Sequence, residues 1–298
     1  MSRILQSHLV PEGIERIRLS DYAPRIFTEF IPSRKGMKKA IKRGAVHVNG
    51  APAQSGRWVE AGQTIELIDE KRIPAKVFPL KLEVIYEDDF LAVVNKPAGL
   101  VVNGNQFRTL QNALAFNLHP TSQADALLQI RPVHRLDSLT SGLVIVAKSA
   151  RACQDLGRQF EHKTIKKRYN AIVMGDIPTQ GTIDTPIDGK MALTQYYLLQ
   201  KVPSLRSEYL ALLDVFPQTG RTHQIRIHLS SIGHPILGDK LYGPSGKILK
   251  GKGMFLCATE LVFMHPIHQQ VIHVKIDPPE KYLKLMDREA HRWRKYRV

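Results

Sequence analysis

The chain has 298 residues and 43% of them are hydrophobic, so it can form one large domain and a small one. Lysine and arginine total 43 against 27 aspartate and glutamate residues, and a net charge of +16 favours a polyanionic partner such as nucleic acid. Only Cys153 and Cys257 occur, without a CxxC motif, which excludes a disulfide scaffold or zinc knuckle and favours a reducing compartment.

The first 20 residues lack the apolar stretch of a signal peptide. No apolar run in the chain approaches the roughly 18 residues of a membrane-spanning helix. We therefore expect a cytoplasmic protein that has no membrane partner.

A basic helix is predicted within PSRKGMKKAIKRGAVHVNG, residues 32–50. Ser33 can cap its first turn and Gly44 can end it. Its apolar stripe is Met37, Ala40 and Ile41. Its six cations are Arg34, Lys35, Lys38, Lys39, Lys42 and Arg43. These charges repel one another unless phosphates neutralise them, so we predict that they bind RNA or DNA; the alternative is a solvated basic face.

A short strand, an Asn49-Gly50 hairpin turn and a second strand follow the basic helix. This pattern resembles the small RNA-binding domain first known from a ribosomal small-subunit protein, and we assign that domain to residues 1–68. Residues 69–80, DEKRIPAKVFPL, are charged and proline-containing and are predicted to be a linker.

Residues 81–298 mix short apolar strands with helical stretches without clean βαβ periods. We expect an α+β domain with a mixed, largely antiparallel sheet. Residues 82–102 indicate a strand, an acidic turn, a strand and a loop, and residues 208–217 indicate another strand. Residues 222–233 indicate a helix, and residues 280–298 a C-terminal one. Thr222 is predicted to cap the 222–233 helix, and Gly233 to end it. Its apolar stripe consists of Ile225, Leu229 and Ile232.

The stretch RPVHRLDSLTSG, residues 131–142, places the lone acid Asp137 in a basic loop just before the apolar strand LVIVA. Nearby cations favour the ionised form of a carboxyl group. An ionised aspartate can act as a nucleophile, as a general base or as a stabiliser of positive charge. The alternative is a structural, salt-bridged aspartate.

Arg226 flanks the apolar stripe of the 222–233 helix and could turn inward. A buried arginine needs an acidic partner, because an unpaired buried charge is costly. Asp137 is a candidate for that partner.

Four stretches together carry a family resemblance. They are VVNKPAGLVV, HRLDSLTSGLVIVAKS, KRYNAIVMG and TGRTHQIRIHLSSIGHPILGDKLYG. In this order they resemble the motifs of the RluA-type pseudouridine synthases, over residues 81–275. The resemblance implies that the protein isomerises uridine to pseudouridine in structured RNA.

The resemblance also implies roles for particular residues. Asp137 would be the catalytic acid residue, Arg226 its partner, and Tyr169 would pack on the flipped uracil and help to deprotonate its carbon 5. Arg135 would enter the RNA stack in place of the extruded base. Further candidate RNA contacts are His134, Arg221, His223 and Lys96.

The chemistry of the reaction agrees with a single carboxylate. Uracil leaves the sugar as a delocalised anion, so it does not need the second carboxyl group that glycoside hydrolases commonly use. Asp137 would either attack the anomeric carbon or remove the 2′ proton, and the sequence does not choose between these routes. Nothing is oxidised and no phosphate moves, so we expect neither a metal nor a cofactor.

Three weaker signals have structural interpretations. The acidic stretch 87–89 is predicted to be a hairpin turn. The region of His265, His268 and His273 is predicted to be a solvated turn and not a metal site. Residues 243–253 lack the P-loop spacing and are predicted to be a basic loop.

The sequence favours large-subunit ribosomal RNA over tRNA as the substrate and a monomeric protein. The alternatives are a non-catalytic RNA-binding or ribosome-assembly protein and a glycosidase that releases free uracil.

Overall fold

The computed structural model describes residues 4–54, 56–69, 77–244 and 252–296. The chain divides into two compact units, residues 1–75 and 76–298. The division falls inside the stretch that we predicted as a linker, of which residues 70–76 lie outside the described part.

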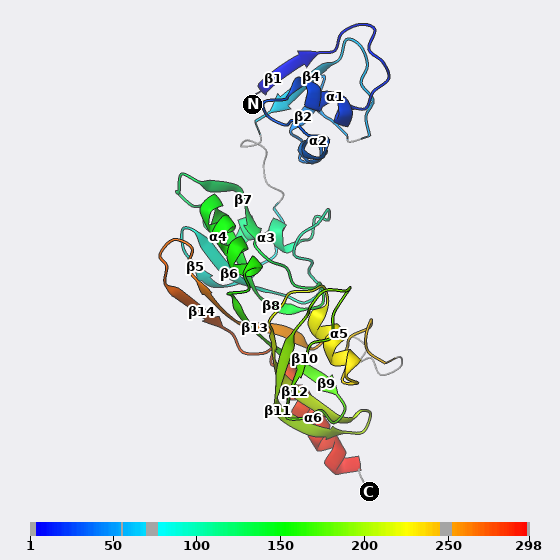
Figure 1. Cartoon of the computed structure of the whole chain (residues 1–298), viewed down its shortest axis with the longest axis vertical. Helices are drawn as coiled ribbons and strands as arrows, with labels where there is room; N and C mark the ends of the chain where they lie inside the picture. The colour runs from blue at the N-terminus through cyan, green and yellow to red at the C-terminus, as the bar shows by residue number, and fades with distance from the viewer. Residues whose placement is uncertain (1–3, 55, 70–76, 245–251, 297–298) are drawn as a thin grey trace. The chain divides into compact units, whose positions relative to one another are not determined.

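The first unit is a four-stranded antiparallel sheet, in the order β1-β4-β2-β3, with two helices (Figure 1). Its elements are β1 (Ile4–Leu9), α1 (Leu19–Ile26), α2 (Arg34–Lys42), β2 (Val46–Val48), β3 (Ala51–Pro52) and β4 (Thr64–Ile68). The predicted basic helix is confirmed as α2. The hydroxyl of Ser33 accepts a hydrogen bond from the Gly36 amide at 3.0 Å, and the apolar stripe of α2 is buried in the core of the unit.

The second unit contains a ten-stranded sheet that runs β10-β11-β12-β9-β13-β8-β6-β5, with β14 paired to β13 and β7 to β8. The strands are β5 (Glu83–Glu87), β6 (Leu91–Lys96), β7 (Ala126–Pro132), β8 (Ser141–Ser149), β9 (Lys166–Met174), β10 (Gln180–Ile183), β11 (Thr194–Ser204), β12 (Glu208–Pro217), β13 (Leu256–Met264) and β14 (Val271–Lys275). The helices are α3 (Leu110–Asn117), α4 (Ala150–Glu161), α5 (Gln224–Ser231) and α6 (Lys281–Tyr296). The predicted strand 208–217 and the predicted C-terminal helix are confirmed as β12 and α6.

Among these strands only β8 and β13 pair in parallel; the other pairs of the sheet are antiparallel, as the predicted fold class requires. The parallel contact depends on Gly142, where a Cβ atom would lie 2.1 Å from the carbonyl oxygen of Ala258. Gly142 also has a φ of +113°, which side chains with a Cβ rarely adopt. The close approach brings the loop before β8, which carries Asp137, next to the middle of the sheet.

The start of α5 differs from the prediction. Thr222 does not cap the helix: His223 adopts a left-handed conformation, with a φ of 56°, and the helix begins at Gln224. The Gln224 side chain accepts a hydrogen bond from the Arg221 amide at 3.0 Å, which holds the turn before the helix. Ile232 is 37% exposed at the end of the helix, so it does not belong to the buried stripe.

No helix in the described part of the chain is long and apolar enough to cross a membrane. Most of the predicted basic loop 243–253 lies outside the described residues.

Candidate active site

A cavity of about 290 Å³ opens between the loop before β8, the strand β9 and the start of α5. Its lining includes His134, Arg135, Asp137, Tyr169, Arg221, His223 and Arg226. A second cavity of about 270 Å³ shares Arg135, Asp137, His223 and Arg226 with the first. Asp137 therefore lines both cavities, and the fold brings together seven of the site residues that the sequence singled out.

The two carboxylate oxygens of Asp137 have different surroundings. Oδ2 accepts a hydrogen bond from Nη1 of Arg226 at 3.1 Å. Oδ1 lies 3.7 Å from Nε2 of His223, beyond hydrogen-bonding distance. The side chain is 18% exposed and lines both cavities. The predicted Asp137–Arg226 pair is present, and it leaves one oxygen of the acid open.

Arg226 has a second acidic partner, Asp239, which the sequence reasoning missed. Nε of Arg226 donates to Oδ2 of Asp239 at 2.7 Å, and Nη2 donates to Oδ1 at 2.9 Å. Burial raises the pKa of the Asp239 carboxyl, but the hydrogen bonds from Arg226 and from backbone amides outweigh burial and hold that pKa below its usual value. A guanidinium has five N–H donors, so one carboxylate could not satisfy a buried arginine, and this was the signal for a second acid.

Tyr169 lies on β9, and its side chain packs against the apolar core on both sides of the site. Burial, with a smaller effect from the negative charge of Asp137, raises the pKa of the Tyr169 phenol well above its usual value. The hydroxyl therefore keeps its proton at neutral pH. Tyr169 lines the same cavity as Asp137.

Lys96 was predicted to contact RNA, but its side chain is fully buried. Its ammonium donates to the carbonyl oxygens of Pro97, Leu100 and Ser138 at 3.0, 2.7 and 3.1 Å. Burial lowers the pKa of Lys96 to about 8, although the charge of Asp137 acts in the opposite direction. Lys96 thus fastens the loop after β6 to the residue that follows Asp137, and it does not reach solvent.

His134 was also predicted to contact RNA, and the structure instead gives its ring an internal role. Its Nε2 accepts a hydrogen bond from the Ile145 amide at 2.9 Å, and its ring lies 4.6 Å from the ring of Phe160. Burial lowers the pKa of His134 to about 3, so the ring is neutral at physiological pH. A neutral ring with this hydrogen bond supports the wall of the cavity and supplies no positive charge for phosphate.

The remaining predicted contacts are at the surface. Arg135 is exposed at the edge of both cavities, and Arg221 is held by a hydrogen bond from its Nε to the carbonyl oxygen of Met191 at 3.0 Å. In the first unit all six cations of the basic helix are exposed, and Arg34 pairs with Asp21 at 2.6 Å.

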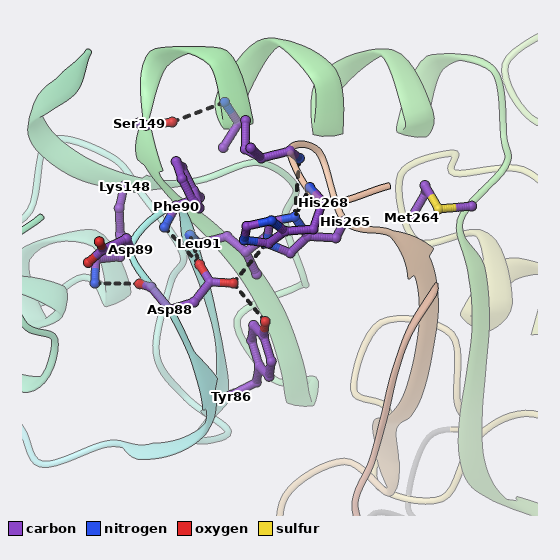
Figure 2. Close-up of polar contacts among 12 residues, drawn as sticks. Tyr86, Asp88, Asp89, Phe90, Leu91, Lys148, Ser149, Met264, His265 and His268 are labelled. Carbon is purple, nitrogen blue, oxygen red and sulfur yellow. Dashed lines mark hydrogen bonds and ion pairs between the residues drawn. The ribbon is translucent and has the colours of Figure 1, made fainter. Parts of the chain in front are cut away.

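A separate polar cluster contains the acidic turn and two of the histidines. Figure 2 shows Asp88 between the hydroxyl of Tyr86 and the stacked rings of His265 and His268. The turn prediction is confirmed, whereas the prediction that these histidines are solvated is wrong for His265, which is fully buried. In the described part of the chain no three His, Cys, Asp or Glu side chains are grouped so that they could hold a metal ion.

Several known proteins are similar to this chain. The model of the RNA pseudouridylate synthase family matches residues 90–231, which include Asp137, Tyr169 and Arg226. An uncharacterized RNA pseudouridine synthase of Aquifex aeolicus (strain VF5) is 36% identical, over 91% of this chain and 93% of that protein. The ribosomal large subunit pseudouridine synthase D of Nitrosomonas europaea is 34% identical, over 88% of this chain and 81% of that protein.

Solved structures show the same fold. Human RNA pseudouridylate synthase domain containing 1 has a TM-score of 0.56 and 27% sequence identity to this chain, over 67% of this chain and 84% of that one.

Proposed function

The chain belongs to the RluA-type family of RNA pseudouridine synthases, isomerases that act on RNA, and we propose that it modifies large-subunit ribosomal RNA with Asp137 as its catalytic residue. The observation that carries the catalytic assignment is the open Oδ1 of Asp137, a carboxylate whose other oxygen is held by a buried arginine. The ribosomal RNA substrate is supported by relatives of this chain that are named ribosomal large subunit pseudouridine synthase D.

In the proposed reaction the bond from N1 of uracil to C1′ breaks, the base rotates, and C5 bonds to C1′. The proton that leaves C5 is balanced by the proton that N1 gains. Asp137 either attacks C1′ or removes the 2′ proton, and in both routes Oδ1 is the reacting atom because Arg226 occupies Oδ2. Arg226 fixes the direction of the carboxylate.

Tyr169 would contact the face of the uracil. Stacking on an extruded base stabilises it by about 1–3 kcal/mol, which offsets part of the cost of taking the base out of its stack. Because Tyr169 holds its own proton tightly, its hydroxyl can take the C5 proton only if it passes its own to another group. The ring would therefore hold the base, and the hydroxyl would relay the C5 proton to another group.

The RNA contacts form the second part of the proposal. Residues 1–68 would be an RNA-binding domain, residues 69–80 a linker and residues 81–298 the catalytic domain. The five exposed cations of α2 and the exposed Arg43 at its C-cap would contact phosphates. In the catalytic domain Arg135, Arg221 and His223 at the cavity would contact the substrate strand. A ribosomal RNA substrate also implies action in the cytoplasm, and we propose that the enzyme works as a monomer.

Mapping of pseudouridines in all cellular RNA, with and without the gene, tests this function. We expect one or more positions in large-subunit ribosomal RNA to revert to uridine when the gene is deleted. The wild-type gene should restore them, and a gene that encodes Asp137→Asn should not, because asparagine keeps the shape of the side chain but is neither a nucleophile nor a base.

Each contrary result has a distinct meaning. Reversion confined to tRNA would refute the ribosomal substrate. Restoration by Asp137→Asn would refute the catalytic assignment. Free uracil in a chromatogram of the purified reaction would indicate a glycosidase instead of an isomerase.

A further inference from the structure

The turn that follows α5, residues 239–242, lies behind the two side chains that surround Asp137. Asp239 at its start contacts Arg226, and Tyr242 at its end contacts His223. The hydroxyl of Ser230, on α5, donates to the carbonyl oxygen of Tyr242 at 2.9 Å and fastens the turn to the helix. One short turn is therefore connected to both neighbours of the reacting carboxylate.

The carboxylate of Asp239 is held by four hydrogen bonds. Two come from Arg226, and two come from the backbone amides of Leu241 and Tyr242, at 2.9 and 3.2 Å from Oδ1. The Asp239 side chain is fully buried, so it cannot contact RNA itself. The backbone amides fix the Asp239 carboxylate, and that carboxylate binds Nε and Nη2 of Arg226. The guanidinium is thereby oriented so that its Nη1 points at Asp137.

Tyr242 supports the same two side chains from the other end of the turn. Its hydroxyl lies 3.0 Å from Nδ1 of His223, and its ring centroid lies 5.0 Å from Cζ of Arg226. When the hydroxyl donates to Nδ1, the proton of the imidazole is on Nε2, which faces Oδ1 of Asp137 at 3.7 Å. In that tautomer Nε2 presents a donor, and not a lone pair, to the carboxylate.

We infer that Asp239 and Tyr242 are positioning residues for the isomerisation: through Arg226 and His223 they fix the direction of the Asp137 carboxylate and limit how far its charge is neutralised. This inference rests on the proposed role of Asp137. Asp239 takes two of the three hydrogen bonds that Arg226 donates to carboxylates and carries a full negative charge. Asp137 consequently shares the cation with a competitor and remains more reactive than it would be in a simple ion pair.

Three full-length variants test the inference. In Asp239→Asn the amide oxygen can still accept hydrogen bonds from the amides of Leu241 and Tyr242. The amide NH₂ faces an N–H of Arg226, so the pair of hydrogen bonds from Arg226 is broken. Tyr242→Phe keeps the ring over Arg226 and removes the hydrogen bond to His223. Asp88→Asn is the matched control, because Oδ1 of Asp88 also accepts from the amides two and three residues further on, those of Phe90 and Leu91, in the cluster of Figure 2 outside the site.

Turnover is measured as tritium release from an unmodified transcript of large-subunit ribosomal RNA labelled at carbon 5 of uridine, and binding of the same transcript is measured separately. We expect kcat to fall about 100-fold in Asp239→Asn and roughly tenfold in Tyr242→Phe, with unchanged RNA affinity, because misplaced reacting groups lower the rate without weakening binding. Asp88→Asn should match the wild type in both measurements.

A second measurement does not depend on turnover. In protein labelled with ¹³C at the aspartate carboxyl groups, with the Asp137 signal assigned from Asp137→Asn, the chemical shift of Asp137 should change in Asp239→Asn and stay unchanged in Asp88→Asn. If the wild type does not turn over the transcript, the proposed function fails, and this chemical shift still decides the inference. Wild-type kcat and an unmoved Asp137 signal in Asp239→Asn would overturn it. If Asp239→Asn does not fold, wild-type kcat in Tyr242→Phe would overturn it.

Discussion

Replacing Arg226 by methionine should destabilise the protein mainly through Asp239 and not through Asp137. Methionine keeps most of the length of the side chain, so the change removes the charge and the hydrogen bonds with little cavity. The wild-type Arg226 side chain is 6% exposed. Its guanidinium donates two hydrogen bonds to Asp239, whose side chain is fully buried, and one to Asp137, whose side chain is 18% exposed. The loss of stability in Arg226→Met should therefore come mainly from the carboxylate of Asp239, which stays buried without its cation.

The expected sizes follow from this difference in burial. Breaking a buried ion pair by removing one partner costs about 3–5 kcal/mol, because the other charge remains buried. We expect a destabilisation of that size in Arg226→Met. Adding Asp239→Asn should restore about 2–3 kcal/mol, whereas adding Asp137→Asn should restore less than about 1 kcal/mol, since water reaches Asp137. Equilibrium denaturant titrations of the wild type, the single variants and both double variants give these values.

The same variants should differ in how stability depends on pH. In the wild type the pKa of Asp239 lies below its usual value, so its contribution to stability is present above about pH 4 and is lost as the pH falls further. In Arg226→Met burial acts without the cation and raises that pKa, so the folded variant takes up a proton and gains relative stability on acidification. The gap between the two proteins should narrow by more than about 1 kcal/mol from pH 7.5 to 4.5. A constant gap, or equal rescue by both aspartate substitutions, would refute the assignment of the stranded charge to Asp239.

Three further predictions concern Tyr169, residues 1–75 and His134. Tyr169→Ala should weaken RNA binding by about 1–3 kcal/mol more than Tyr169→Phe does. Tyr169→Phe should slow turnover severely. Full-rate turnover by Tyr169→Phe would exclude the hydroxyl from the chemistry. Removal of residues 1–75 should lower the slope of log affinity against log salt by roughly 0.7–0.9 for each phosphate that this unit neutralises, and an unchanged slope would mean that the unit does not bind the RNA. The folded-state pKa of His134 is about 3, below its unfolded value of about 6.5, so the protein should lose stability as the pH falls below about 6.5. In His134→Gln, thermal unfolding at several pH values should show a melting temperature that depends less on pH.

The parts of the site that sequence reasoning located depend on short-range rules. The lone acid before an apolar strand and the inward arginine of an amphipathic helix identified Asp137 and Arg226, and the general cost of a buried charge predicted that they meet. Asp239 was missed because the reasoning ended once one partner had been found. The number of donors on a guanidinium would have required a second acceptor, and the only sequence signal was an acid in the turn after the helix.

Lys96 and His134 show what charge alone cannot indicate. Both lie in motifs of the family and both look suited to bind phosphate, but whether a side chain faces a cavity or supports a loop depends on packing between strands far apart in sequence. Lys96 reaches Ser138, 42 residues away, and the burial of His134 depends on Phe160. Likewise, the left-handed conformation of His223 displaced the predicted cap at Thr222, and no local propensity indicated it.

The rigidity of Asp137 has a consequence for how substrate must approach. One of its oxygens is held by Arg226, which Asp239 immobilises, and the backbone that follows it is held by the buried ammonium of Lys96 at the Ser138 carbonyl. An acid fixed at both its side chain and its backbone cannot swing toward a nucleotide that remains stacked in RNA. The nucleotide must instead leave its stack and enter the cavity, where the Tyr169 ring can take the place of the neighbouring bases. In the proposed function the basic surfaces would supply the free energy of extrusion, and the net charge of +16 agrees with that requirement.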